Sequence, residues 1–406
     1  MCLLMTYTLV SVPKLQKNSY FTEGSHRMEY RNLGKTGLSV SEIGFGPEWM
    51  TGTPEETRAI AETLRKAGVN YLDCWMPDPH IRANLGYAMK DHTDEWIVQG
   101  HIGACWVDGQ YLRSRDVALV KAAFEDELEL LGVDHFEVGM MHYIDSVEEF
   151  RTCLEGPYYE YVQELLYAGT IRHVGLSTHN PEVALEAVHR DVVEVIMFSI
   201  NPAFDLMPPS EDVNDLFGDF AEAGERIEPL RAELYSLCEE KNIALTVMKP
   251  YAGGRLLMDE QSPFGKALTP VQCIHYCLTR PAVASVLAGY KTVEEAQAAL
   301  AYEQATEGER DFARVIANAP ARKAYFGQCT YCGHCQPCAV GIDIATVNKF
   351  ADLALIQDTV PQSIRSHYLE LDKNASDCIA CGNCEPNCPF GVKIMERMEE
   401  TERLFA

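Results

Sequence analysis

Beyond Met28, the chain alternates between short apolar runs and longer segments in which apolar residues recur at helical spacing. The short runs have the length and composition of buried strands, and the longer segments have the apolar stripe of helices that cover a sheet. One such segment, residues 116–132, ends in Gly, which commonly terminates a helix. The predicted strands are residues 42–46, 69–74, 96–103, 135–142, 173–179, 193–201, 243–250 and 284–290.

This series of strand–helix units predicts an α/β fold, a (β/α)₈ TIM barrel, because eight pairs over about 280 residues are typical of that architecture. A doubly wound open sheet is the alternative, but no Gly-rich dinucleotide fingerprint follows the first strand. In a barrel, the chemistry lies where the strands end. Residues expected at that mouth are Asp73, His101, His142, Ser177, His179, Asn201, Lys249, Tyr290 and Lys291. The long acidic segment 202–226 is either a lid or a solvated insertion.

After residue 306 the chain becomes rich in closely spaced cysteines, which indicate a second domain. Of 15 cysteines, eight lie between residues 329 and 388, in the strings CTYCGHCQPC and CIACGNCEPNCP. The second string is the C-x₂-C-x₂-C-x₃-C-P pattern of bacterial [4Fe–4S] ferredoxins. By analogy with two-cluster ferredoxins, one cluster is expected on Cys329, Cys332, Cys335 and Cys388, and the other on Cys378, Cys381, Cys384 and Cys338. A pair of zinc sites is the alternative.

Composition excludes several classes of partner. Lys and Arg number 34 against 60 for Asp and Glu, a formal net charge of −26, which disfavours nucleic acid and anionic lipid as partners. No apolar run approaches the length of about 20 residues that a membrane helix needs. Residues 1–27 carry no recognisable secretion signal and are expected to be a disordered extension or an upstream misreading of the start. We therefore expect a cytoplasmic protein with a barrel over residues 28–306 and a helical two-cluster, ferredoxin-like domain over residues 307–406.

Six stretches carry a resemblance to a known family. They are YRNLGKTGLSVSEIGFG, AGVNYLDCWMPDPHIRANLGYAM, VDHFEVGMMH, IRHVGLSTHNPE, MKPYAGGRLL and AGYKTVEEAQAAL. In this order they resemble the aldo/keto reductases from Met28 to about residue 305, and the tail resembles the dicluster module of the iron–sulfur branch of that family. The resemblance implies an oxidoreductase that acts on a small carbonyl or alcohol substrate and binds NAD(P)H at the barrel mouth.

The catalytic tetrad that the resemblance implies is matched only in part. Of its Asp, Tyr, Lys and His, the first corresponds to Asp73 and the last to His142. Asp78 occupies the expected position of the tyrosine, and no tyrosine occurs between residues 72 and 86. His101 lies at or next to the position of the lysine, and residues 91–120 contain no lysine. Another group must therefore transfer the proton, or the reaction differs.

Three interpretations of the altered mouth follow. In the first, reduction is retained and His142 is the acid, with Asp73 holding His101 and with Asp78 as a second candidate acid. The nicotinamide would meet Ser177, Asn201, Lys291 and Thr292, although Phe198 replaces the Gln that would grip its carboxamide.

The second interpretation is redox chemistry without hydride transfer. It would use electrons from the clusters, or a metal held by residues from Asp73, Asp78, His80, His101 and His142. The third is a non-catalytic electron-transfer barrel. A ferredoxin or flavodoxin is the expected electron partner. For Asp78, capping of the helix that starts near residue 80 is the structural alternative to catalysis.

Overall fold

The computed structural model describes residues 28–206, 228–312, 315, 329, 335–355, 360, 362–388 and 391–406. The predicted extension 1–27, most of the acidic segment 202–226 and Cys332 lie outside these residues.

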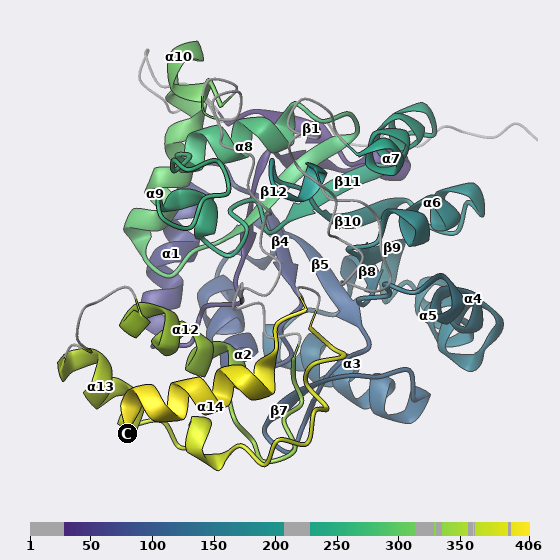
Figure 1. Ribbon diagram of the computed structural model, residues 1–406. Coiled ribbons are helices and arrows are strands. Elements are labelled where there is room, and N and C mark those ends of the chain that lie inside the picture. The colour runs from purple at the N-terminus through teal and green to yellow at the C-terminus, as the bar shows by residue number, and fades with distance from the viewer. Residues whose placement is uncertain are drawn as a thin grey trace, which may run out of the picture.

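Eight parallel strands close into a barrel, as the sequence predicts (Figure 1). Around the barrel they follow one another in chain order, and the last strand pairs with the first. They are β3 (Ile43–Gly46), β4 (Tyr71–Cys74), β5 (Ile97–Ile102), β8 (Phe136–Met141), β9 (Ile171–Thr178), β10 (Val195–Ser199), β11 (Ala244–Met248) and β12 (Val283–Gly289). The predicted (β/α)₈ barrel is confirmed.

Helices follow the strands and cover the outside of the barrel. They are α1 (Pro54–Lys66), α2 (Pro79–Met89), α3 (Val117–Leu131), α4 (Val147–Glu155), α5 (Pro157–Ala168), α6 (Pro181–His189), α7 (Pro229–Glu240), α8 (Pro270–Leu278) and α9 (Val293–Leu300). Most begin at a side-chain cap, because the first backbone N–H groups of a helix otherwise lack an acceptor. Thr53 and Glu56, for example, form a capping box at the start of α1.

Close packing of β4, β5 and β8 brings three site-bearing strands together. Gly100 of β5 has no room for a side chain, since a Cβ there would lie 2.4 Å from the ring of Phe136 on β8. The pairing aligns Asp73 with Gln99, and His101 with Met140. Because side chains alternate along a strand, Gln99 and His101 share the inner face of β5.

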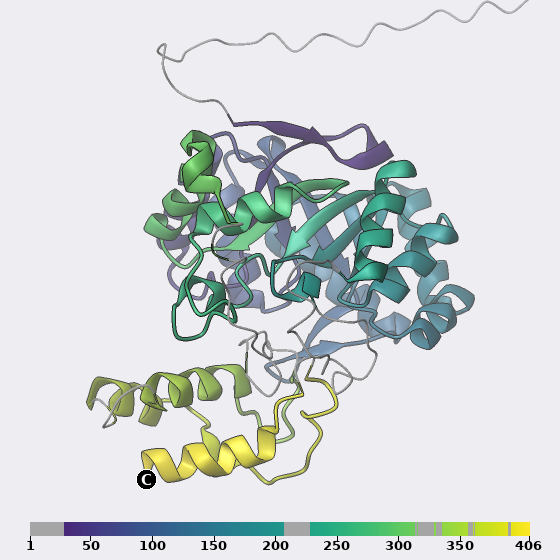
Figure 2. The ribbon, with the colours of Figure 1, turned by 45° about the horizontal axis from the view of Figure 1, so that its top comes forward.

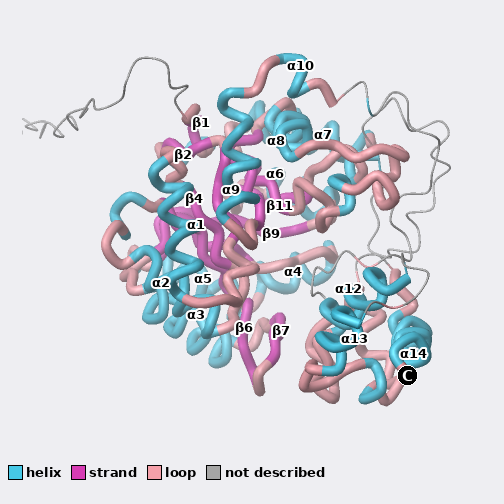
Figure 3. Tube along the Cα trace, turned by 90° about the vertical axis from the view of Figure 1, so that its left-hand side faces the viewer, coloured by secondary structure: helices cyan, strands magenta, loops and turns pink. Residues whose placement is uncertain are grey.

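A β-hairpin extends from the end of β5 before α3 begins (Figure 3). It consists of β6 (Ala104–Val107) and β7 (Gln110–Arg113), paired antiparallel. Its two turn residues, Asp108 and Gly109, have φ angles of 51° and 76°. Positive φ at both positions is the type I′ geometry whose twist matches that of the flanking strands.

The C-terminal segment lies at the mouth of the barrel. A second hairpin, β1 (Tyr30–Asn32) with β2 (Ser39–Ser41), leads directly into β3 and so marks the opposite, N-terminal end of the strands. Figure 2 shows this hairpin at one end of the barrel and the C-terminal helices beyond the other. Those helices are α12 (Ile344–Leu355), α13 (Gln362–Leu369) and α14 (Ile394–Phe405), preceded by the short α10 (Glu307–Arg310).

A shared apolar core joins the C-terminal segment to the mouth. Phe204, Leu256 and Phe264 from the mouth loops belong to the same buried cluster as Ile342 and Met398 from the segment. Burial of apolar surface on both sides fixes the segment against the barrel. None of the helices in the described part of the chain is long and apolar enough to span a bilayer.

Candidate active site

Asp73 and His101 form the buried base of the site. Both side chains are 1% exposed, and the Nε2 atom of His101 lies 2.8 Å from Oδ1 of Asp73. The side-chain amide of Gln99 donates a second hydrogen bond of 2.5 Å to the same oxygen. The hydroxyl of Tyr71 donates one of 2.6 Å to the side-chain oxygen Oε1 of Gln99. A carboxylate inside a barrel is therefore held by two donors, as a buried charge requires.

His142 and Tyr111 extend this array toward the hairpin. The Nδ1 atom of His142 lies 2.7 Å from Nδ1 of His101, and its Nε2 lies 2.8 Å from the hydroxyl of Tyr111 on β7. The structure thus brings together Asp73, His101 and His142, as expected from the strand ends, and adds a tyrosine that no sequence argument identified.

The chemistry of the partners fixes the direction of each hydrogen bond. A carboxylate only accepts, so His101 carries a proton on Nε2, and a neutral His101 ring then presents Nδ1 as an acceptor. His142 must then donate from Nδ1, which leaves its Nε2 to accept from the hydroxyl of Tyr111. One direction, from Tyr111 through His142 and His101 to Asp73, satisfies the whole array.

Electrostatics favour this assignment. Burial holds the pKa of His142 well below its usual value, and His101, Arg115 and Arg113 lower it further. Burial also raises the pKa of Tyr111. Near neutral pH, His142 is therefore a neutral acceptor and Tyr111 a protonated donor, which does not suit His142 to the role of acid expected from the sequence.

Trp75 covers the array from the loop after β4. Its ring stacks on His142 at a centroid distance of 6.1 Å and meets Tyr111 edge-on at 5.8 Å. Its indole N–H donates a 3.1 Å hydrogen bond to Glu48, in the loop after β3. Burial, with a contribution from Asp73, raises the pKa of Glu48 to about 7. Glu48 is thus a second proton-exchanging group at the mouth.

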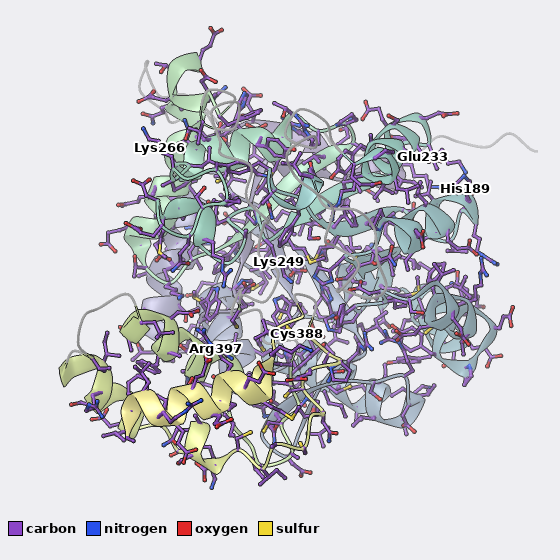
Figure 4. All side chains as sticks on the ribbon, viewed as in Figure 1. His189, Glu233, Lys249, Lys266, Cys388 and Arg397 are labelled. Carbon is purple, nitrogen blue, oxygen red and sulfur yellow. The ribbon has the colours of Figure 1, made fainter. Side chains whose placement is uncertain are left out.

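A separate chain of polar contacts surrounds Lys249, near the centre of the barrel in Figure 4. Its Nζ lies 3.0 Å from Nε2 of His179, whose Nδ1 lies 2.9 Å from Asp145. Burial and the charge of Lys249 lower the pKa of His179, so the neutral ring donates to Asp145 and accepts from the ammonium group.

Asp78 and His80 have local structural partners and are not part of the hydrogen-bonded array. The Asp78 carboxylate caps α2 by accepting from the backbone N–H of His80 at 2.8 Å. The His80 ring lies 3.1 Å from the carbonyl oxygen of Gly52. The observed contact of Asp78 is therefore the helix capping that was the structural alternative to a catalytic role.

The residues predicted to bind a nicotinamide lie at or after strand ends at the mouth. Ser177 is buried near the end of β9. Asn201 accepts from the backbone of Phe204 and donates to the carbonyl of Lys249, so its amide shapes the loop. Thr292 caps α9, and Lys291 stacks over Trp49 at 4.4 Å.

Four predicted cluster cysteines line one pocket. Cys338, from the first string, faces Cys378, Cys381 and Cys384, from the second, across apolar walls that include Ile344 and Met398. This is the mixed set of thiols expected for one cluster. Within the described residues, no three His, Cys, Asp or Glu side chains already stand in a metal-binding arrangement.

The other described cysteines that were predicted to bind a cluster are Cys329, Cys335 and Cys388, which belong to or pack against the same apolar core. Figure 4 shows Cys388 between the barrel and the C-terminal helices. A cysteine-rich, largely apolar environment suits iron–sulfur chemistry.

Several residues of the site were missed by sequence reasoning, among them Tyr111, Glu48 and Gln99. A signal for the first was present: Asp-Gly between alternating apolar residues is a strong hairpin pattern, and it places residues 104–113 at the mouth. For Glu48 no comparable signal exists, because its properties depend on burial beneath Trp75.

Comparisons with known proteins agree with this architecture. Residues 371–393 match the 4Fe-4S binding domain. The chain is 25% identical over 285 residues to the uncharacterized oxidoreductase YqkF of Bacillus subtilis, covering 66% of this chain and 89% of that protein. It is 27% identical over 167 residues to the aldo-keto reductase YhdN of the same organism, covering 38% and 48%.

Solved structures show the same fold. The holo form of aldo-keto reductase AKR11C1 from Bacillus halodurans superposes with a TM-score of 0.55 at 23% identity, covering 73% of this chain and 98% of that one. A putative aldo-keto reductase from Pseudomonas aeruginosa gives 0.51 at 18% identity, covering 70% and 97%. Residues 42–304, well over half of the chain, match the aldo/keto reductase family. The protein is therefore an oxidoreductase of the aldo/keto reductase family with a 4Fe-4S binding motif.

Proposed function

We propose that the protein interconverts the carbonyl and alcohol forms of a small organic substrate, with Tyr111 as the group that exchanges a proton with the substrate oxygen. The observation that carries this proposal is the hydrogen-bonded line from the Tyr111 hydroxyl through His142 and His101 to Asp73. In position it differs from the tetrad of the family, but it contains the same elements: a phenol, a histidine and a buried carboxylate.

The line moves one proton without moving any heavy atom far. When an alcohol gives its proton to Tyr111, the phenol proton passes to Nε2 of His142, the His142 Nδ1 proton to His101, and the His101 Nε2 proton to Asp73. The reverse sequence delivers a proton to a carbonyl oxygen. Because all four groups are buried and already in hydrogen-bond contact, little reorganisation is needed.

The cofactors we propose are two [4Fe–4S] clusters, with NAD(P)H as a further candidate, and they would supply the electrons or the hydride. One cluster would be held by Cys338, Cys378, Cys381 and Cys384, whose side chains line one pocket. The other would be held by Cys329, Cys332, Cys335 and Cys388. Ser177, Asn201, Lys291 and Thr292 remain the candidates for contact with a nicotinamide dinucleotide.

We further propose the division into a barrel over residues 28–306 and a cluster domain over residues 307–406. A ferredoxin or flavodoxin would exchange electrons with that domain. Since exposed iron–sulfur clusters and many reduced cysteines suit a reducing compartment, we propose the cytoplasm as the location.

A metal held in the barrel mouth is a weaker alternative. The facing Nδ1 atoms of His101 and His142 are only 2.7 Å apart, whereas two nitrogens that share a zinc-like ion lie about 2.0–2.1 Å from the ion and therefore farther from one another. Asp73 and Tyr111 occupy the two Nε2 atoms. The imidazoles are thus arranged to share protons.

Two measurements test the proposal. Anaerobic purification followed by iron and sulfide analysis should give about eight of each per chain. Stoichiometric zinc instead would refute the clusters. Titration with NADH and NADPH, followed by cofactor fluorescence, separates hydride transfer from electron transfer by the clusters alone. Absence of turnover with a panel of ketones, aldehydes and alcohols, using both nicotinamides and reduced ferredoxin, would refute the carbonyl–alcohol assignment.

A further inference from the structure

The hydrogen-bonded series Tyr111–His142–His101–Asp73 is called the relay below. The β6–β7 hairpin has one face toward this relay and the other toward the C-terminal segment. Tyr111 and its neighbour Gln110 are consecutive on β7, so their side chains point to opposite faces of the strand. Tyr111 contacts His142 at 2.8 Å. The Oε1 atom of Gln110 accepts a 2.7 Å hydrogen bond from the backbone N–H of Cys338. The wall between Cys338 and the relay is therefore one strand thick.

The loop that carries Cys338 is held on both sides of this contact. The backbone N–H of Cys338 also lies 2.7 Å from Oε1 of Gln336. The side-chain amide of Gln336 in turn donates to the backbone carbonyl of Ile342 at 2.8 Å. Gly341 of the same loop also lies near Gln110, since a Cβ at Gly341 would be 3.8 Å from the amide nitrogen of Gln110. The loop from Gln336 to Ile342 is thus closed on itself and docked on Gln110.

A second contact anchors the start of the same cysteine string. Arg255, buried in the mouth loop after β11, donates a hydrogen bond to the backbone carbonyl of Cys329. Both Cys329 and Cys338 are therefore bound to the barrel through their backbones. The first cysteine string is fixed to the mouth at its first and last members.

From these contacts, we propose that Gln110 is a positioning residue that docks the Cys338 loop on the hairpin, and that the hairpin carries electrons between the cluster at Cys338 and the substrate at Tyr111. This inference rests on the proposed function, because it takes Cys338 as a cluster ligand. It assigns opposite faces of one strand to the two halves of the reaction: electrons enter past Gln110, and the proton is exchanged at Tyr111.

The overall step balances with a ferredoxin- or flavodoxin-class donor as the reductant. Reduction of a ketone breaks the carbonyl π bond and forms one C–H and one O–H bond, which requires two electrons and two protons. The donor supplies two electrons, one after the other, and is oxidised. Tyr111 delivers the proton to oxygen and is reprotonated through the relay, and water supplies the proton that reaches carbon.

The test compares Gln110→Ala with Gln110→Glu in the full-length, anaerobically purified protein. Ala removes the one of the two acceptors of the Cys338 N–H that belongs to the barrel, whereas Glu retains an oxygen at the same reach. Asp108→Asn, at the exposed hairpin turn, is the matched control on the same hairpin. Hydrogen–deuterium exchange of residues 335–342 reports docking of the loop, and stopped-flow absorbance reports oxidation of the dithionite-reduced protein by substrate.

With Ala, backbone exchange over residues 335–342 should accelerate about fivefold, the effect of losing one ordinary hydrogen bond. Substrate-driven oxidation should slow by a factor of about 10 to 100, since small displacements between reacting groups have effects of that size. Iron content should not change. Glu should restore the exchange protection, and Asp108→Asn should match the wild type in both measurements.

Wild-type exchange and oxidation rates in the Ala variant would overturn the inference while leaving the clusters and the relay intact. Accelerated exchange with an unchanged oxidation rate would also overturn it, because docking would then have no effect on electron transfer. If the wild-type protein contains no iron and sulfide, the proposed clusters are refuted and the inference fails with them. That outcome differs from wild-type rates in an iron-loaded Ala variant, so the two failures are distinguishable.

Discussion

The Nδ1 atoms of His101 and His142 lie 2.7 Å apart, so one imidazole must donate to the other. Asp73 determines which ring donates, because its carboxylate accepts a hydrogen bond from Nε2 of His101. The Nδ1 atom of the neutral His101 ring is then left to accept from His142. The consequence reaches Tyr111, whose hydroxyl must donate to His142. A buried carboxylate at the base of the barrel mouth thus sets the protonation of a phenol three hydrogen bonds away.

Removal of that phenol hydroxyl tests the relay most directly. Tyr111→Phe should lower kcat by a factor of about 10² to 10⁴, the usual contribution of a positioned acid or base. Substrate KM should change much less, because the ring that packs against Trp75 is retained. The measurement is steady-state kinetics with whichever carbonyl or alcohol the substrate panel identifies.

Tyr158→Phe is the matched control for this variant. Its hydroxyl is buried and donates a 2.6 Å hydrogen bond to the backbone carbonyl of Ile102 instead of to an imidazole. It should lose some stability while retaining most of kcat. If Tyr111→Phe is as active as Tyr158→Phe, then Tyr111 does not exchange the substrate proton.

Glu48 should make the protein less stable as the pH rises from about 4.5 to about 7. Its pKa in the folded protein is raised to about 7 from 4.5, mainly by burial, so the folded state prefers the protonated carboxyl group. The folded state therefore has no penalty below pH 4.5, the penalty grows between pH 4.5 and about 7 while only the unfolded state ionises, and it stays constant at higher pH. Since the side chain is half-buried, we expect a penalty of about 1–2 kcal/mol at pH 8.5.

The Glu48→Gln variant checks this sign. Gln stays neutral and can still accept from the indole N–H of Trp75. Its unfolding temperature should equal or fall slightly below that of the wild type at pH 5 and exceed it at pH 8.5. A difference that does not depend on pH would contradict the assigned titration of Glu48.

Sequence patterns predicted the barrel well because each strand and helix carries its own periodicity. The strand ends also identified Asp73, His101 and His142, since carboxyl ends of parallel strands must meet at one mouth. Tyr111 escaped this rule because it lies on a hairpin outside the barrel sheet. The direction of the relay was also beyond the sequence, since it depends on which nitrogen faces which partner.

A buried ion pair behind the site should be sensitive to single substitutions. Arg82 on α2 and Glu127 on α3 lie 2.9 Å apart, with side chains 2% and 0% exposed. Burial raises the pKa of Glu127 to about 7 despite the attraction of Arg82. Arg82→Met should destabilise the protein by about 3–5 kcal/mol, because it leaves an unpaired carboxylate in the core.

The double variant Arg82→Met/Glu127→Leu should recover most of that loss, because two apolar side chains of similar volume leave no uncompensated charge. Unfolding temperatures of the wild type, both single variants and the double variant provide the comparison. If the double variant is as unstable as the sum of the singles, then the two residues do not act as a pair, and their packing alone accounts for the effect.

Substitution of Cys338 tests the prediction that each cluster is bound by cysteines from both strings. Cys338 lines one pocket with Cys378, Cys381 and Cys384, although the sequence places it 40 residues before the first of them. Cys338→Ser should therefore reduce iron and sulfide from about eight to about four per chain. Cys381→Ser should remove the same four, and the double variant should remove no more. Cys238→Ala, which alters a buried barrel cysteine outside both strings, should retain all eight. If Cys338→Ser and Cys381→Ser each remove about four and the double variant removes all eight, the two cysteines bind different clusters, and the mixed ligand set is wrong.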